Sequence, residues 1–243
     1  MKNINEISLL ELSKYINSLR RILLKEGFFE HHLYLTTNYK IESTETFKIE
    51  DKLFLRYNPE PEIWAVGEVY DKFFWIDSLF RNEKKLTSIH KKEFTVVDIY
   101  LKEKDREQMI SFFVKILENI EEELNLPKLS ILPLEYIKYR DFKKEKLNKH
   151  NKYWLIVTDY PIEESFYDEL NNLHNETKKF EIYFVSKREI IELAVGGNLG
   201  KNFNKKKFIK DEDKFVNKKV INQKFIGFGV GIERLIYIYK NIE

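Results

Sequence analysis

The 243-residue chain contains no cysteine, which excludes disulfide bonds and thiolate metal sites. It has no run near the ~20 apolar residues needed to span a membrane, and its first residues, MKNINEISLLEL, lack the apolar core of a signal peptide. An excess of either charge is missing too, because 42 Lys and Arg face 40 Asp and Glu. A net charge of +2 gives no general field for nucleic acid. These absences predict a cytoplasmic protein.

Apolar and aromatic side chains, by contrast, are plentiful. Hydrophobic residues make up 43% of the chain and aromatic residues 15%, which is enough to bury one large core. Neither an internal repeat nor a low-complexity linker divides the sequence. We therefore predict one globular domain over residues 1–243, with no separate second domain.

Residues 72–101, KFFWIDSLFRNEKKLTSIHKKEFTVVDIYL, predict a β-hairpin with a charged loop. Phe73–Arg81 and Glu93–Leu101 are rich in aromatic and β-branched residues, as strands are, whereas Asn82–Lys92 is polar. The side chains of a strand alternate between the two faces of a sheet. One face of the second strand should therefore carry four side chains: Phe94, Val96, Asp98 and Tyr100.

This face of the hairpin has an unusual composition for a packed core. Arg81 and Glu83 leave the first strand on one face, beside the exposed aromatic ring of Phe94 on the second. A planar base could stack on that ring, and Arg81 has the planar, two-pronged geometry that binds phosphate. The alternative is a solvated hairpin lying over a helix. The residues alone leave both interpretations open.

Two segments carry a resemblance to a known family. The pattern F-R-N-E, followed by H and then by E-F-T and D, resembles motif 2 of the class II aminoacyl-tRNA synthetases, most closely the subgroup for aspartate, asparagine and lysine. GFGVGIERL, from Gly227 to Leu235, is similar to motif 3 of these enzymes, and TDYPIEESFY resembles the asparaginyl type. The resemblance implies an α+β catalytic domain, with an antiparallel β-sheet flanked by helices.

The resemblance also implies an ATP site with two catalytic arginines. Arg81 would contact the α-phosphate and the substrate carboxylate, and Arg234 would hold the γ-phosphate. The other ATP contacts would come from Glu83 at the adenine edge, His90 beside the γ-phosphate, Phe94 against the base, and the backbone at Gly229 and Gly231. A carboxylate is already ionised at neutral pH, so forming an acyl-adenylate requires no general base.

A dimer is implied by the N-terminal segment. Ser8–Lys25 predicts an amphipathic helix, with Ser8 and Glu11 in capping-box spacing and Gly27 at its end. A helix, a glycine and then a strand resemble motif 1, which builds the homodimer interface of these synthetases. Tyr34 stands where the family has proline, so this part of the resemblance is incomplete.

The remaining elements follow from apolar periodicity and caps. Asp105 and Gln108 predict the start of a helix that runs to Leu124. We expect a helix with a loop over Leu134–Phe142, and a mobile or helical insert over Gly200–Lys224. The other predicted elements are strands at Tyr153–Asp159, Phe180–Phe184 and Phe225–Val230, and a helix at Ile232–Lys240.

A magnesium site is implied by two glutamates. Glu181 and Glu189 have the spacing of the acidic pair that holds Mg²⁺ against the ATP phosphates in asparaginyl-type enzymes, and hard oxygen ligands suit this ion. Gly196 and Gly197 match a glycine pair near the amino-acid substrate. About three more residues than in the family separate Glu189 from these glycines, so Glu192 is an alternative ligand.

The amino-acid pocket departs from the family. Glu62, which follows a proline, matches a residue that meets the substrate's amino group, and Tyr100 matches a pocket tyrosine of lysyl-type enzymes. Two cations that grip acidic substrates are replaced by Gly200 and Ala65. Aspartate should therefore be a poor substrate, since its second carboxylate would be buried unpaired. We expect a neutral or cationic side chain, unless the extra residues bring Lys201 into the pocket.

The resemblance runs from about Ser8 to Glu243, and leaves no room for an N-terminal anticodon-binding domain. We predict an ATP-dependent ligase that activates an amino acid as its adenylate and passes it to a small-molecule amine, a protein or a tRNA end rather than to a decoded tRNA. An ammonia-dependent asparagine synthetase is an alternative. A non-catalytic regulatory or binding module is another, but it would not need the glutamate pair.

Overall fold

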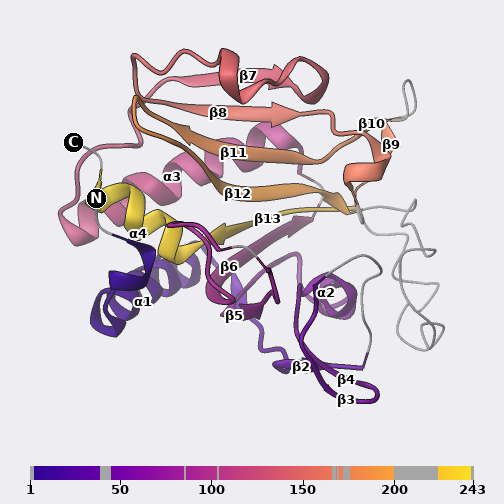
Figure 1. Cartoon of the computed structure of the whole chain (residues 1–243). Helices are drawn as coiled ribbons and strands as arrows, with labels where there is room; N and C mark the ends of the chain where they lie inside the picture. Colours follow the sequence, from indigo (N-terminus) through magenta and orange to yellow (C-terminus); the bar gives the residue numbers. More distant parts are fainter. Residues whose placement is uncertain are drawn as a thin grey trace.

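In the computed structural model (Figure 1), the described residues are 3–38, 45–84, 86–102, 104–165, 168, 170–171, 176–199 and 224–241. The insert predicted over Gly200–Lys224 lies outside them except for its last residue. No helix in the described ranges combines the length and the apolar character needed to cross a membrane.

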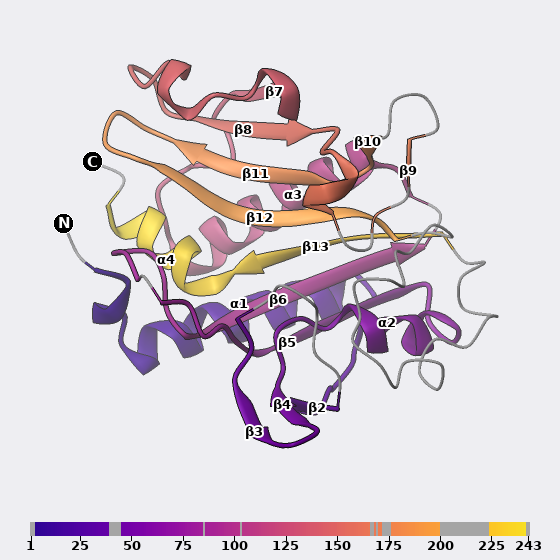
Figure 2. The same cartoon turned by 45° about the vertical axis from the view of Figure 1, so that its right-hand side comes forward.

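An eight-stranded sheet forms the centre of the molecule, as Figures 1 and 2 show. Its edge strands β1 and β7 pair in parallel with their neighbours, and all other pairs are antiparallel. The predicted antiparallel α+β class is therefore confirmed. In spatial order the strands are β1 (Phe29–Glu30), β5 (Lys72–Phe80), β6 (Glu93–Lys102), β13 (Phe225–Gly231), β12 (Ile190–Leu199), β11 (Phe180–Val185), β8 (Tyr153–Thr158) and β7 (Leu134–Lys138).

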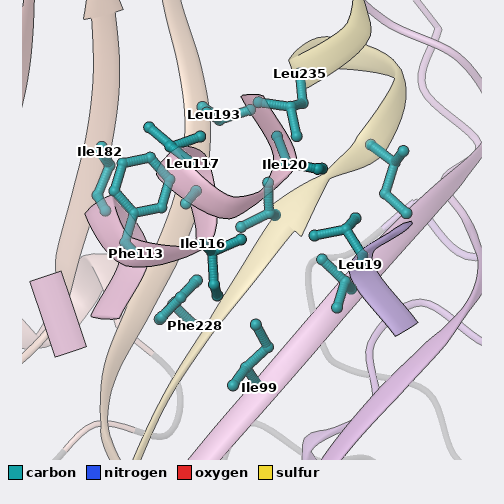
Figure 3. Close-up of a cluster of buried hydrophobic side chains, with 14 of the residues drawn as sticks. Leu19, Ile99, Phe113, Ile116, Leu117, Ile120, Ile182, Leu193, Phe228 and Leu235 are labelled. Atoms are coloured by element: carbon teal, nitrogen blue, oxygen red, sulfur yellow. The ribbon is translucent and has the colours of Figure 1, made fainter. Parts of the chain in front are cut away.

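Three helices share the main core with one face of this sheet. They are α1 (Leu9–Lys25), α3 (Arg106–Leu124) and α4 (Ile232–Lys240). Figure 3 shows Leu19 of α1, Ile116 of α3 and Leu235 of α4 gathered with strand side chains such as Ile99 and Phe228. Burial of these apolar groups from water fixes the helices on the sheet.

Local signals set the ends of two helices as predicted. Ser8 and Glu11 form a complete capping box at the start of α1, and Asp105 and Gln108 form another at the start of α3. Each box satisfies backbone N–H groups that have no partner within the helix. Asn125 ends α3 in the left-handed conformation, with φ of 53°.

The helix predicted over Leu134–Phe142 is wrong. The structure has strand β7 there, followed by a 3-10 turn at Tyr139–Asp141. β7 pairs in parallel with β8 from Leu134 to Lys138, and Ile137 packs against apolar side chains of β8 and β11. Pairing with a strand distant in sequence gives this segment its backbone hydrogen bonds, and this overrides local helix propensity.

The smaller elements frame the side of the sheet away from the main core. β2 (Thr36–Thr37), β4 (Leu53–Leu55) and β3 (Lys48–Glu50) form a three-stranded sheet, and α2 covers Glu60–Gly67. β9 (Leu170–Asn171) and β10 (Glu176–Thr177) form a two-stranded ribbon. Residues just before α2 and just before β9 line the cavity described next.

Candidate active site

A cavity of about 350 Å³ opens on the sheet face opposite the three helices. Side chains on β6 alternate, so that Val97 and Ile99 enter the main core while Phe94, Asp98 and Tyr100 line the cavity. Every described residue that the sequence suggested for an ATP, amino-acid or metal site lines this cavity, except Glu62 and Glu189. The tertiary structure thus brings together the predicted hairpin, the glycine-rich strand β13 and the start of α4.

The floor of the cavity depends on glycines in β13. A Cβ atom added at Gly227 would lie 2.4 Å from Cδ1 of Tyr100, and one added at Gly229 would lie 2.4 Å from Oδ1 of Asp98. Both distances are far shorter than a normal contact. Absence of a side chain at these two positions therefore leaves room for Tyr100 and Asp98 to reach across from β6 to the cavity floor.

Arg81 follows β5 and projects over the cavity between two rings. Its guanidinium carbon lies 5.0 Å from the centre of the Tyr57 ring and 5.1 Å from that of Phe94. Such contacts hold a guanidinium flat against an aromatic face. Its Nε is buried and has no hydrogen-bond partner among the described residues. A buried donor without a partner costs free energy, so this position suits an anionic ligand.

Asp98 is an acid in an apolar setting beneath Arg81. Burial raises the pKa of Asp98 to about 7, and the nearby charge of Arg81 opposes the rise. Sequence alternation placed Asp98 on this face without giving it a role. An acid enclosed by apolar strand residues was the available signal.

Arg234 lies in the first turn of α4 at another side of the cavity. Its Nη1 donates to the backbone oxygen of Glu192 at 2.8 Å and to Oε1 of the same residue at 3.2 Å. The neighbouring Glu233 is buried and accepts a hydrogen bond of 2.9 Å from the backbone N–H of Thr95. That bond ties α4 to β6, so Arg234 emerges from a fixed backbone.

The loop between β5 and β6 supplies two further predicted residues. His90 lines the cavity, and its Nδ1 lies 2.6 Å from the hydroxyl of Thr87. Glu83 lines the cavity as well. Gly231 precedes α4 and also borders the cavity.

Of the two predicted metal ligands, only Glu181 reaches the cavity. Glu189 lies in the turn before β12, where its carboxylate accepts a hydrogen bond of 3.2 Å from the hydroxyl of Tyr237. Glu192, the alternative, lines the cavity. A β-bulge explains why Glu192, and not Glu189, lies on the cavity face of β12. Ile182 pairs with Ala194 but Tyr183 pairs with Glu192, so one residue of β12 has no partner in β11.

This bulge decides which way Glu192 points. Leu193 is the extra residue, and both Leu193 and Ala194 are buried in the main core. Without the bulge, strict alternation would put Glu192 on the core face together with Ala194. With it, Glu192 and Val195 both border the cavity.

The predicted ligands Glu181 and Glu189 therefore do not form a magnesium site together, and the alternative pair of Glu181 and Glu192 fits such a site poorly. Glu181 is already paired with a lysine and Glu192 with Arg234. Across the described residues, no three Asp, Glu or His side chains gather closely enough to hold a metal ion. Magnesium binds oxygen ligands in near-ideal octahedral geometry. The carboxylates of Glu181 and Glu192 instead face an ammonium and a guanidinium group.

Glu62 lies outside the cavity in an ion pair with Arg56. Arg56 is fully buried, and its Nε also donates to the backbone oxygen of Tyr34 at 2.6 Å. A buried guanidinium requires a carboxylate partner, which explains where Glu62 is directed. Asn58 and Pro59, earlier in the same segment, do line the cavity.

The predicted glycine pair, Gly196 and Gly197, borders the cavity. At Gly197, packing against Asp168 explains why the residue is glycine. A Cβ at Gly197 would lie 1.6 Å from Oδ1 of Asp168, so only glycine leaves space for that carboxylate. Burial raises the pKa of Asp168 to about 6, although the hydroxyl of Ser165 and the charge of Lys179 oppose the rise. Gly200 and Lys201, which the sequence placed near this pocket, lie outside the described residues.

Sequence reasoning missed Asp168 and Lys179. Both line the cavity, at the end formed by β11 and the segment before β9. The signal for Lys179 was its position two residues before Glu181, because residues at this spacing share one side of an extended chain.

Sequence comparisons with known proteins identify a family. The family model of class II tRNA synthetases (D, K and N) matches residues 5–243. A lysine–tRNA ligase of Wigglesworthia glossinidia brevipalpis is 31% identical over 144 residues, which are 56% of this chain and 25% of that protein. A lysine–tRNA ligase of Methanoculleus marisnigri is 31% identical over 120 residues, which are 46% and 23% of the two chains.

Solved structures show the same fold. Asparaginyl-tRNA synthetase from Pyrococcus horikoshii, in complex with asparaginyl-adenylate, matches with a TM-score of 0.75 and 17% identity over 95% of this chain and 64% of that one. The enzyme from Entamoeba histolytica matches with a TM-score of 0.73 and 13% identity over 94% and 62%. The matched regions therefore span about a quarter of the lysine–tRNA ligases and less than two thirds of the asparaginyl-tRNA synthetases.

Proposed function

The chain belongs to the class II tRNA synthetase family for aspartate, lysine and asparagine, and on that premise we propose that it is an ATP-dependent ligase that activates an amino acid as its aminoacyl-adenylate. The observation that carries the proposal is Arg81. Its guanidinium lies against Phe94 at the cavity, and its buried Nε has no partner among the described residues. An oxyanion of ATP or of the substrate would supply that partner.

In this reaction a carboxylate oxygen of the amino acid attacks the α-phosphorus of ATP. The bond between that phosphorus and the bridging oxygen breaks, and pyrophosphate leaves with the electron pair. Arg81 would donate to the oxygens of the α-phosphate, where charge develops, and Arg234 would hold the triphosphate from the first turn of α4. Positioned donors in a partly enclosed site are the main source of rate in such a step.

Phe94 is proposed to carry the adenine, with Glu83 at the edge of the base. His90 and the backbone at Gly229 and Gly231 complete the proposed ATP contacts. The support is their common location, since all five border one cavity. Stacking on an aromatic ring is tolerant of geometry, so Phe94 can serve the base while Arg81 moves toward a phosphate.

The amino-acid end is proposed to lie over Tyr100, Gly196 and Gly197, with Asp98 as an added partner for an ammonium group. Asp98 and Tyr100 leave β6 on the same face, next to the glycine floor. A cation would offset the cost of ionising the buried Asp98 carboxylate. This favours a substrate with a neutral or cationic side chain, and disfavours aspartate.

Magnesium supplies charge neutralisation of phosphates when it is bound. We propose that it enters with ATP, because Glu181 and Glu192 are already paired with Lys179 and Arg234. The protein side of the site thus contributes cationic side chains rather than a preformed set of oxygen ligands.

A homodimer is proposed through the edge of the sheet at β1. Phe29, Tyr34 and Leu35 are large hydrophobic residues that are exposed in this region. Exposed hydrophobic side chains in and shortly after an edge strand are typical of a protein contact. The acceptor of the activated amino acid is proposed to be a small amine, a protein or a tRNA end.

Exchange of labelled pyrophosphate into ATP tests the proposal directly. Each of the twenty amino acids is added separately, and the expected result is exchange that depends on one amino acid or a few with neutral or cationic side chains. Aspartate should stimulate exchange poorly. Exchange stimulated by aspartate above all others would restore the asparagine-synthetase alternative, and no exchange with any amino acid would favour a binding module.

A further inference from the structure

A lysine occupies the end of the cavity where the family resemblance predicts a metal ion. Nζ of Lys179 lies 2.9 Å from Oε1 of Glu181, and both side chains line the cavity. The other carboxylate oxygen, Oε2, accepts a hydrogen bond from the hydroxyl of Tyr183. Both oxygens of Glu181 therefore already have partners.

Lys179 is held in place by more than this ion pair. Its Nζ also donates to the backbone oxygen of Glu164 at 3.0 Å, and it lies 4.3 Å from the centre of the Tyr160 ring. Only 15% of its side chain is exposed. A lysine with three separate contacts differs from a mobile surface lysine, because each contact limits its rotamers.

The electrostatics of this end favour a charged carboxylate at Glu181. Burial acts to raise the pKa of Glu181, but the charge of Lys179 and the hydrogen bonds to it outweigh burial, so the pKa lies below its ordinary value. Glu181 is thus a carboxylate balanced by one ammonium. Oε1 of Glu192, the alternative metal ligand, lies 3.2 Å from Nη1 of Arg234, so this carboxylate is also paired with a cation.

A divalent ion at Glu181 would conflict with this arrangement. Magnesium binds carboxylate oxygen at ~2.0–2.1 Å. An ion bound to Oε1 would therefore lie less than ~5 Å from the ammonium of Lys179, and like charges at this distance repel. The ammonium of Lys179 therefore disfavours a metal ion on Glu181 as long as the two side chains remain paired.

We propose that the ammonium of Lys179 takes the position of a metal ion at Glu181, with Glu181 as the positioning residue and the triphosphate of ATP as the ligand that Lys179 faces. The proposal rests on the proposed function for the presence of ATP, but the assignment of Glu181 to Lys179 stands on the contacts alone. Lysine is well suited to this role, since an ammonium contacts phosphate as a compact point charge.

Direct metal binding is the first test, with Mn²⁺ as a spin-active probe of the full chain in the absence of nucleotide. The loss of the free Mn²⁺ signal in electron paramagnetic resonance reports binding. Wild type should bind no Mn²⁺ at Glu181, so that Glu181→Gln leaves the titration unchanged. Lys179→Met, which leaves Glu181 without its ammonium, should bind Mn²⁺ at Glu181 more tightly than wild type does, and the double variant Lys179→Met with Glu181→Gln should lose that gain.

ATP affinity is the second test, measured by calorimetry in EDTA and again with Mg²⁺. Removing EDTA and adding Mg²⁺ should change the wild-type affinity by less than ~3-fold, while Lys179→Met in EDTA should bind ATP ~10-fold more weakly than wild type. Lys179→Arg should keep most of the affinity. Lys146→Met, which removes an exposed lysine, is the matched control and should behave as wild type.

Two results would overturn the proposal. One is Mn²⁺ binding by wild type that Glu181→Gln abolishes and Lys179→Met leaves intact. The other is an unchanged ATP affinity of Lys179→Met in EDTA, with circular dichroism showing a folded variant. If no amino acid supports pyrophosphate exchange, the proposed function fails, whereas the Mn²⁺ titration still decides between Lys179 and a metal at Glu181.

Discussion

Replacing Arg81 is the sharpest test of the active-site assignment. Arg81→Met keeps most of the apolar stem between the Tyr57 and Phe94 rings and removes the charge and all donors. A charge-assisted hydrogen bond is worth roughly 1.5–3 kcal/mol, and Arg81 can direct at least Nε toward an oxyanion. Loss of one or two such bonds in the transition state gives roughly 2–4 kcal/mol, or about 30- to 10³-fold in rate.

The substitution Arg81→Met should affect the stability of the fold much less than the activity. The two ring contacts of Arg81 are worth about 0.5–1 kcal/mol each at a partly open site, and removing the unpartnered Nε relieves a small cost. Arg81→Lys should fall between wild type and Arg81→Met in activity. It keeps the charge but loses the planar, two-pronged geometry.

The assay is amino-acid-dependent pyrophosphate exchange, run beside thermal unfolding followed by circular dichroism. Arg140→Met is the matched control, because Arg140 is an exposed arginine whose nearest acidic partner is the neighbouring Asp141, 3.5 Å away. It should leave both measurements unchanged. Exchange by Arg81→Met within twofold of wild type would refute the reasoning from the unpartnered Nε.

Three further predictions follow from the same contacts. Glu62→Ala should lower the free energy of unfolding by roughly 2–3 kcal/mol, because its arginine partner is fully buried, while the amino-acid KM of the remaining folded enzyme stays near wild type; a large KM change with unaltered stability would instead place Glu62 at the substrate. Glu192→Gln should reduce exchange by about 10-fold, because it loosens Arg234, whereas Glu189→Gln should change it little; the reverse order would return the role to Glu189. The pKa of Asp98 is raised to about 7, so this carboxyl is neutral below that pH and ionised above it. The amino-acid KM should therefore rise by up to ~10-fold per pH unit below 7, and a pH profile that Asp98→Asn does not flatten would argue against an ammonium contact.

Period-two alternation and helix caps are local signals that can be recognised in the sequence. The features of the fold that depend on these signals could therefore be predicted. The hairpin over residues 72–101 and the cavity face with Phe94, Asp98 and Tyr100 follow from alternation, since neighbouring side chains of a strand must point to opposite faces. The start of α1 at Ser8 follows from a hydrogen bond between residues three apart.

Other features depend on pairing between segments that are distant in the sequence. β7 is a strand because β8 offers it backbone partners, although its own residues suggested a helix. Glu62 forms an ion pair with Arg56, and Lys179 forms one with Glu181, because a buried charge is stable only beside an opposite charge. Such partners are set by how the chain packs.

The exchange of Glu189 for Glu192 shows the physical reason most clearly. Spacing along the chain measures how far apart two glutamates are, but the face on which each lies depends on the register of β12 against β11. One unpaired residue, Leu193, shifts that register and turns Glu192 toward the cavity. The sequence shows which residues could form the site, but it does not show which of them meet there, because register and charge pairing arise from contacts between strands that are distant in the chain.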